Sequence, residues 1–223
     1  MKPHGLIPDE WLVSYAAGSL SEEHALLVAT HAHYQPDLQE KIMDAEAIGG
    51  ALLEDIDPVS FDGAALDRVM ESLDSNQGTA ETNHETNQPV ERNGDVDLAP
   101  CLQEYLGQPL DSLKWRTMGP GMKNVKLSRG PNGENLWLLK ARGGTHMPEH
   151  GHNGAEMTLV LRGGYTVDGK HYGPGFMEIA DTDVENHRPI IDEGADCICL
   201  VVTHAPLRMK SLIGKVMQPF IGL

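Results

Sequence analysis

The chain has 223 residues, a length that suits one large domain or two small ones. Its 33 acidic and 17 basic residues give a net charge of −16, so we expect no direct nucleic-acid binding and a basic protein as partner. No apolar run reaches the ~18 residues of a membrane span, the first residues lack a signal peptide's apolar segment, and three cysteines form no disulfide framework, so no membrane association and a cytoplasmic location are expected.

Residues 1–75 have the pattern of a small four-helix domain. Apolar stripes at helical spacing follow proline and acidic residues, and Gly18 is a natural end for the first helix. Ser19 and Glu22 have the spacing of a capping box for the second helix. The helices are expected to begin near Pro8, Ser19, Pro36 and Phe61. Their core is small, so the domain should gain from a partner or a metal.

Residues 76–95 contain almost no apolar side chain and are predicted to be a flexible polar linker. A second domain, residues 96–223, opens with a short helix expected over residues 98–106. Apolar residues then alternate with period two, which predicts strands around residues 125–128, 136–139, 158–161 and 197–202. Glycine and proline turns separate them, as in an antiparallel β-barrel. The expected fold class is therefore α+β with two domains.

Four side chains of the second domain have the pattern of a metal site. His150 and His152 lie two residues apart, so on a strand they project from the same face, and Glu156 follows four residues later. His187 ends a later strand-like stretch and can supply a fourth ligand. Three imidazoles and a carboxylate suit one divalent ion: zinc is expected first, and iron or manganese are the alternatives.

The glycines around this motif give it a family likeness. Gly144, His150, His152, Glu156 and Gly163 have the spacing Gly-x5-His-x-His-x3-Glu-x6-Gly, which resembles the first motif of the cupin family. Gly173-Pro174-Gly175 followed by His187 resembles a loosened second motif. The resemblance covers about residues 96–205 and implies a small antiparallel β-barrel that holds one metal inside.

The N-terminal domain resembles a second family. Residues 17–22 and 28–31, joined to a cupin, resemble the helical domain of ChrR-type zinc-containing anti-sigma factors. That family binds zinc through a His-x3-Cys-x2-Cys motif and an earlier histidine, which correspond here to His31 and His4. Gln35 and Leu38 stand at the two cysteine positions, so the usual site cannot form. A substitute site around His4 and His31 is a second candidate, and we expect instead that the domain folds without metal.

Cys197 and Cys199 lie two residues apart on an apolar strand and should face the same side. Their Cα separation would be near the upper limit for a disulfide. Two small buried side chains are the simpler interpretation. An oxidisable pair beside the metal cavity is the alternative, and this spacing also fits the resemblance to ChrR-type proteins.

The resemblance implies a regulatory protein rather than an enzyme. The helical domain would bind and inhibit an extracytoplasmic-function sigma factor, and the cupin would sense oxidative stress, such as singlet oxygen or an organic peroxide, and release it. The alternative is a cupin metalloenzyme of the dioxygenase type with a helical appendage. The helical domain and linker favour the regulator, because a simple dioxygenase has no need for them.

Overall fold

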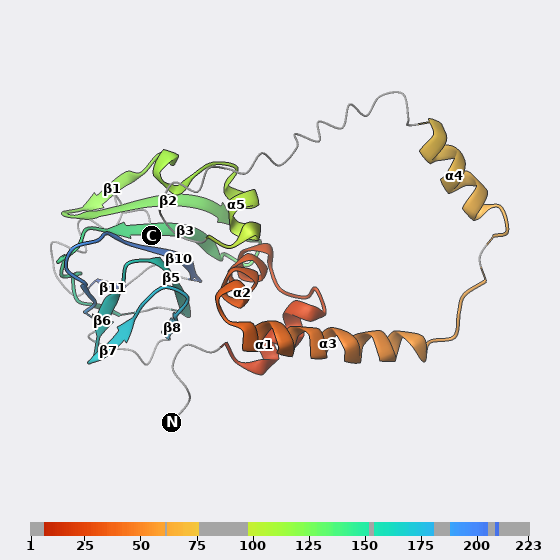
Figure 1. Ribbon diagram of the computed structural model, residues 1–223, viewed down its shortest axis with the longest axis horizontal. Coiled ribbons are helices and arrows are strands. Elements are labelled where there is room, and N and C mark those ends of the chain that lie inside the picture. The colour runs from red at the N-terminus through yellow and green to blue at the C-terminus, as the bar shows by residue number, and fades with distance from the viewer. Residues whose placement is uncertain are drawn as a thin grey trace. The chain divides into compact units, whose positions relative to one another are not determined.

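The structure, a computed structural model, describes residues 7–60, 62–75, 98–151, 154–180, 188–204 and 208–209 (Figure 1). Contacts divide the chain into two compact units, one formed by Met1–Gly49 with Val96–Leu223 and the other by Gly50–Asp95. These units do not coincide with the expected division at residues 75 and 95. Whether residues 1–75 fold by themselves stays a prediction.

Helices account for the first part of the chain and for one short segment before the strands. Local chemistry explains where they begin and end: α1 follows Pro8, starts with two acidic residues, and is followed by Gly18 with a φ of 64°. The helices are α1 (Asp9–Ala16), α2 (Glu22–Tyr34), α3 (Pro36–Glu54), α4 (Ala65–Ser75) and α5 (Pro100–Leu106), with a 3-10 turn, η2 (Leu110–Ser112). None of the helices described is both long and apolar enough to cross a bilayer.

Two helix starts differ from the sequence-based expectation. The capping box of Ser19 and Glu22 does not form, because the Ser19 hydroxyl donates to the Ser14 carbonyl at 3.0 Å and α2 begins only after Ser21. The fourth helix begins at Ala65 rather than near Phe61, which lies outside the described residues. The Asp62 carboxylate accepts the Ala64 N–H at 3.2 Å, a local turn that delays the helix.

Antiparallel pairing joins all the described strands. They form three sheets, with orders β1-β2-β3-β10-β5-β8, β7-β6-β9 and β11-β4, rather than the single closed barrel that was expected. The predicted strands around residues 125, 136, 158 and 197 are confirmed, as is the short helix before them. The strands are β1 (Arg116–Gly119), β2 (Met122–Arg129), β3 (Asn135–Ala141), β4 (His150–Gly151), β5 (Glu156–Arg162), β6 (Tyr165–Val167), β7 (Lys170–Tyr172), β8 (Met177–Ala180), β9 (Ile190–Ile191), β10 (Cys197–Thr203) and β11 (Arg208–Met209).

Strand β10 is buried on both faces and separates two apolar clusters. Ile198, Leu200 and Val202 belong to the cluster on the helix side, and Cys197, Cys199 and Val201 belong to the cluster on the opposite side. This division follows from the two-residue period of a strand, whose successive side chains point to opposite faces. The six-stranded sheet therefore contributes to two separate cores.

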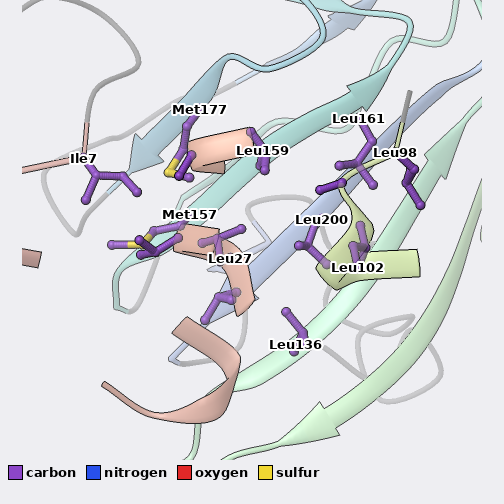
Figure 2. Packing of buried hydrophobic residues seen from close by; sticks show 14 of the residues in the cluster. Ile7, Leu27, Leu98, Leu102, Leu136, Met157, Leu159, Leu161, Met177 and Leu200 are labelled. Atoms are coloured by element: carbon purple, nitrogen blue, oxygen red, sulfur yellow. The ribbon is translucent and has the colours of Figure 1, made fainter. Parts of the chain in front are cut away.

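The helix-side cluster includes residues from α2 and α5 as well as from the sheet. Leu27 and Val28 of α2 have no solvent exposure, and neither has Leu102 of α5. Figure 2 shows Leu27 and Leu102 among the strand side chains, close to Leu200. Because burying a leucine stabilises a fold by about 1.5–3 kcal/mol, helices and sheet depend on this common core.

The end of α2 meets the turn that precedes β8. Gln35 donates its side-chain amide to the Gly175 carbonyl at 3.0 Å. Gly175 has a φ of +80°, and a Cβ added there would lie 2.7 Å from the Cβ of Tyr34. Only glycine allows both this backbone conformation and this close approach. The contact fixes the C-terminal end of α2 against the β region.

Candidate metal centre and partner-binding surface

One of the four predicted metal ligands has its side chain in the described part of the chain. Glu156 lies at the start of β5 and lines a cavity of about 30 Å³. Its Oε1 accepts the hydroxyl of Thr158 at 3.1 Å. A carboxylate held by a neighbouring hydroxyl at the wall of a cavity suits a metal ligand.

All four ligands remain predictions, and the side chains of the other three lie outside the described part of the chain. The backbone of His150 lies in β4, where it pairs with Met209 of β11. His152 and His187 lie outside the described residues. The position of Glu156 fits the expected site, and His150, His152 and His187 are the residues that would complete it. A bound metal there would supply a fixed positive charge and open coordination positions.

The wall of this cavity includes polar residues that the sequence analysis missed. The Tyr165 hydroxyl donates to Glu178 Oε2 at 2.6 Å, and both side chains line the cavity with Thr158 and Glu156. Burial, followed by the charge of Glu178, raises the pKa of Tyr165 well above its usual value. The phenol therefore stays protonated and remains a hydrogen-bond donor. Polar residues at alternate positions of the predicted strands could have indicated these side chains in the sequence.

Cys197 and Cys199 line the same cavity as Glu156. Both are buried and unoxidised, with their sulfur atoms 3.6 Å apart. The hydrogen bond with Cys197, then burial, then the charges of Glu178 and Glu156 raise the pKa of the Cys199 thiol well above its usual range. Since the thiolate is the reactive form, Cys199 is held as an unreactive thiol.

His31 is fully buried, and the candidate N-terminal metal site does not fit its surroundings. Among the described residues, its ring nitrogens have no hydrogen-bond partner with normal geometry, and no group of three potential ligands gathers around it. Leu38 is 1 % exposed and belongs to the helix-side core, while Gln35 is bonded to Gly175. Apolar packing therefore occupies one of the two cysteine positions. His4, the other proposed ligand, lies outside the described residues.

A group of potential metal ligands that the sequence did not reveal lies between α2 and the strands. His24, Glu134 and His204 each offer one ligand atom, and these atoms all lie within 4.8 Å of one another. Burial and then the nearby His204 lower the pKa of His24, while Glu134 and Glu23 oppose this shift. Positions 24, 134 and 204 are far apart in the chain, so no local motif connects them.

Large apolar side chains are exposed in groups on two of the helices described. On α4 they lie at helical spacing and form one stripe: Leu66, Val69, Met70 and Leu73, each between 53 % and 69 % exposed. On α3, Leu38 and Ile42 are buried, but Met43, Ile48 and Leu52 are about two-thirds exposed. The side chain of Ile48 also lines a groove of about 240 Å³ between α1 and α3. Apolar faces of this extent are typical of protein-binding surfaces.

Comparisons with known proteins agree with both parts of the chain. The family model of the ChrR cupin-like domain matches residues 104–207. The anti-sigma-E factor ChrR of Cereibacter sphaeroides is 38 % identical over 219 residues, which cover 97 % of each chain. The crystal structure of Rhodobacter sphaeroides SigE in complex with the anti-sigma ChrR matches with a TM-score of 0.72 and 34 % identity, over 90 % of this chain and 98 % of that chain.

A weaker match concerns the enzyme alternative. A putative acetylacetone dioxygenase from Methylibium petroleiphilum is 13 % identical with a TM-score of 0.40, over 48 % of this chain and 81 % of that chain. This likeness is too weak to support an argument about activity. The similarity to ChrR covers the helices as well as the strands. The chain therefore belongs to the ChrR family of anti-sigma factors, which are regulatory proteins rather than enzymes.

Proposed function

We propose that this protein binds and inhibits an extracytoplasmic-function sigma factor, and that α4 contributes an essential part of the contact. The exposed apolar stripe of α4 is the observation that carries the proposal. An amphipathic helix with side chains at positions i, i+3, i+4 and i+7 is suited to a groove on a partner. The partner in the similar ChrR structure is SigE, which supports a sigma factor as the occupant.

Charge favours the same kind of partner. Residues 50–75 contain seven acidic side chains and one basic side chain, Arg68. Sigma factors are basic where they approach nucleic acid, so an acidic segment with an apolar stripe can compete for those surfaces. Electrostatic attraction of this type speeds association and weakens as salt screens the charges.

The groove between α1 and α3 supplies a second contact surface in the larger unit. Leu12, Val13, Ala45 and Ile48 give it an apolar floor, and the ion pair between Lys41 and Asp9, at 2.7 Å, lies at its edge. Val13 is 58 % exposed and Ile48 is 65 % exposed, although both are large apolar residues. Burial of these side chains against the sigma factor would add to the affinity.

We further propose that the cupin region is the sensor and that oxidative stress, such as singlet oxygen or an organic peroxide, causes release of the sigma factor. Glu156 lines the cavity where the metal is predicted, which supports a metal-based, oxidant-sensitive centre there rather than one based on the buried Cys199 thiol. A cytoplasmic location and a zinc ion in the cupin belong to the same proposal. The location agrees with a sigma factor as partner, and zinc agrees with a nitrogen-rich ligand set.

The α4 stripe can be tested with the full-length chain and an extracytoplasmic-function sigma factor from the same organism. Leu73→Ala should weaken binding by about 5-fold or more, because truncating a buried interface anchor costs about 1–3 kcal/mol. Glu71→Ala, on the opposite face of the same helix, is the matched control and should change affinity far less. Equal effects of the two substitutions on Kd would contradict the role of the stripe.

The sensor can be tested in a reporter strain that expresses full-length variants. Glu156→Ala should still inhibit the sigma factor but should lose induction by oxidant, because the cavity would lack its carboxylate. Normal induction in that strain would show that this centre does not sense the oxidant. Loss of inhibition without oxidant would indicate instead that Glu156 is needed for the fold.

A further inference from the structure

Four ionisable side chains converge where the start of α2 meets the β region. Glu23 and His24 lie in the first turn of α2, Glu134 directly precedes β3, and His204 directly follows β10. Glu23, His24 and Glu134 are between 3 % and 4 % exposed, whereas His204 is exposed. Ionisable groups are rarely buried to this degree without partners or a metal.

Two atoms of this cluster lack the partners that burial demands. Within the described residues, His24 Nε2 and Glu23 Oε2 are buried and accept or donate no hydrogen bond. The other atom of each group is satisfied: Ser21 Oγ lies 2.8 Å from His24 Nδ1, and Ser128 donates to Glu23 Oε1 at 2.8 Å. Leaving a buried polar atom unpaired is costly, so a missing ligand at this point is chemically expected.

Hydrogen bonding also indicates which nitrogen of His204 can bind a ligand. Its Nδ1 lies 3.4 Å from the carbonyl oxygen of Ala155, and a carbonyl can only accept, so Nδ1 carries the proton. The lone pair is then on Nε2. A metal-binding histidine commonly donates its other N–H to a backbone carbonyl in this way.

The carboxylates complete the set of donors. Glu134 accepts the Asn132 N–H at 3.0 Å, which orients its carboxylate. A Cβ added at Gly130 would lie 2.5 Å from Glu23 Oε2 and 2.6 Å from Glu134 Oε2, so the two oxygens are neighbours around this glycine. One ligand atom from each of His24, Glu134 and His204 lies within 4.8 Å of the others. Ligands of tetrahedral zinc are about 3.4 Å apart, given bond lengths near 2.0–2.1 Å, so small side-chain movements would bring these atoms together.

We propose that His24, Glu134 and His204 form a second divalent-metal site, with Glu23 as the fourth donor, and that zinc is the ion that suits it best. None of its ligands belongs to the predicted cupin set. The exposed His204 gives the ion an entry path. A bound ion would connect the first turn of α2 directly to the end of β10 and to the turn before β3, so it would hold the helices on the strands.

The site can be tested in the full-length chain carrying His150→Ala and His152→Ala, which removes the predicted cupin ligands. After chelation, Co²⁺ serves as a coloured substitute for zinc. About one equivalent should bind with the visible bands of tetrahedral cobalt. Adding His204→Ala or Glu134→Gln should weaken binding at least 10-fold, whereas adding His171→Ala, an exposed histidine bonded to Asp192 at 2.7 Å, should leave it unchanged.

Absence of cobalt binding in the starting protein would overturn the proposal, and so would equal affinity of the His204→Ala and His171→Ala proteins. Far-UV circular dichroism shows whether the starting protein is folded. If it is not, zinc is counted in chains that retain His150 and His152. In those chains, the His204→Ala protein should contain one equivalent of zinc less than the His171→Ala protein. Equal zinc contents would overturn the proposal. The outcome does not depend on binding of a sigma factor.

Discussion

Replacing Gly175 with alanine tests whether α2 is fixed against the turn before β8. The new Cβ would lie 2.7 Å from Tyr34 Cβ and 3.2 Å from Tyr34 Cγ. Tyr34 Cβ is attached to the helix backbone, so it cannot rotate away, and the overlap should cost about 1–3 kcal/mol. The φ of +80° adds about 1 kcal/mol for any residue with a Cβ. We therefore expect a total destabilisation of about 2–4 kcal/mol.

Gly169→Ala is the matched control for this prediction. Gly169 has a φ of +73°, similar to that of Gly175, but nothing lies within 4 Å of an added Cβ. It should therefore show only the backbone cost of about 1 kcal/mol. Urea unfolding followed by circular dichroism gives both free energies of unfolding. If the two variants are equally destabilised, Tyr34 does not contact this turn, and the end of α2 does not pack against it.

Three further predictions concern His31, the cupin metal and the linker. Burial lowers the pKa of His31 from 6.5 to about 4. Between these two pH values only the unfolded chain binds the proton. The free energy of unfolding is therefore highest above pH 6.5 and falls by on the order of 2 kcal/mol at pH 5. His31→Leu should remove this loss in urea titrations at pH 7.5 and pH 5, and an unchanged difference would contradict the assignment. Purified protein should contain a metal ion in the cupin, and the double substitution His150→Ala with His152→Ala should remove it. An unchanged metal content in that variant would argue against the predicted ligand set. Limited proteolysis should cut first within residues 76–95, and early cuts elsewhere would contradict the expected linker.

Local patterns predicted the elements well because each pattern has a local physical cause. The two-residue alternation of β10 predicted a strand, and proline followed by acids predicted the start of α1. Partners outside each local pattern decided the rest. Ser19 bonds to Ser14 instead of capping α2, and no residue of the capping pattern could show this. The closure of a barrel likewise depends on pairing between distant strands.

The apolar stripe of α3 shows a limit of sequence patterns. Leu38, Ile42, Ile48 and Leu52 look alike in the sequence, but the first two are buried and the last two are exposed. A stripe shows that a face will be covered, and it does not show whether this chain or a partner covers it. The two candidate metal sites also differ in how far the sequence could predict them. The local motif led to Glu156 at the cavity, whereas His24, Glu134 and His204 come together only through the fold.

The position of β10 between the two cores has a consequence for signal transmission. Cys199 faces the cavity, and the next residue, Leu200, packs on the helix side of the same strand. Chemistry at the cavity and contacts at α2 are thus separated by the thickness of a single backbone. Since a packed interior cannot absorb displacements, a rotation or shift of β10 caused by oxidation at the cavity would change the surface on which Leu27 rests. If oxidation at the cavity is the signal, as proposed, its shortest route to the helices runs through the sheet from one face to the other.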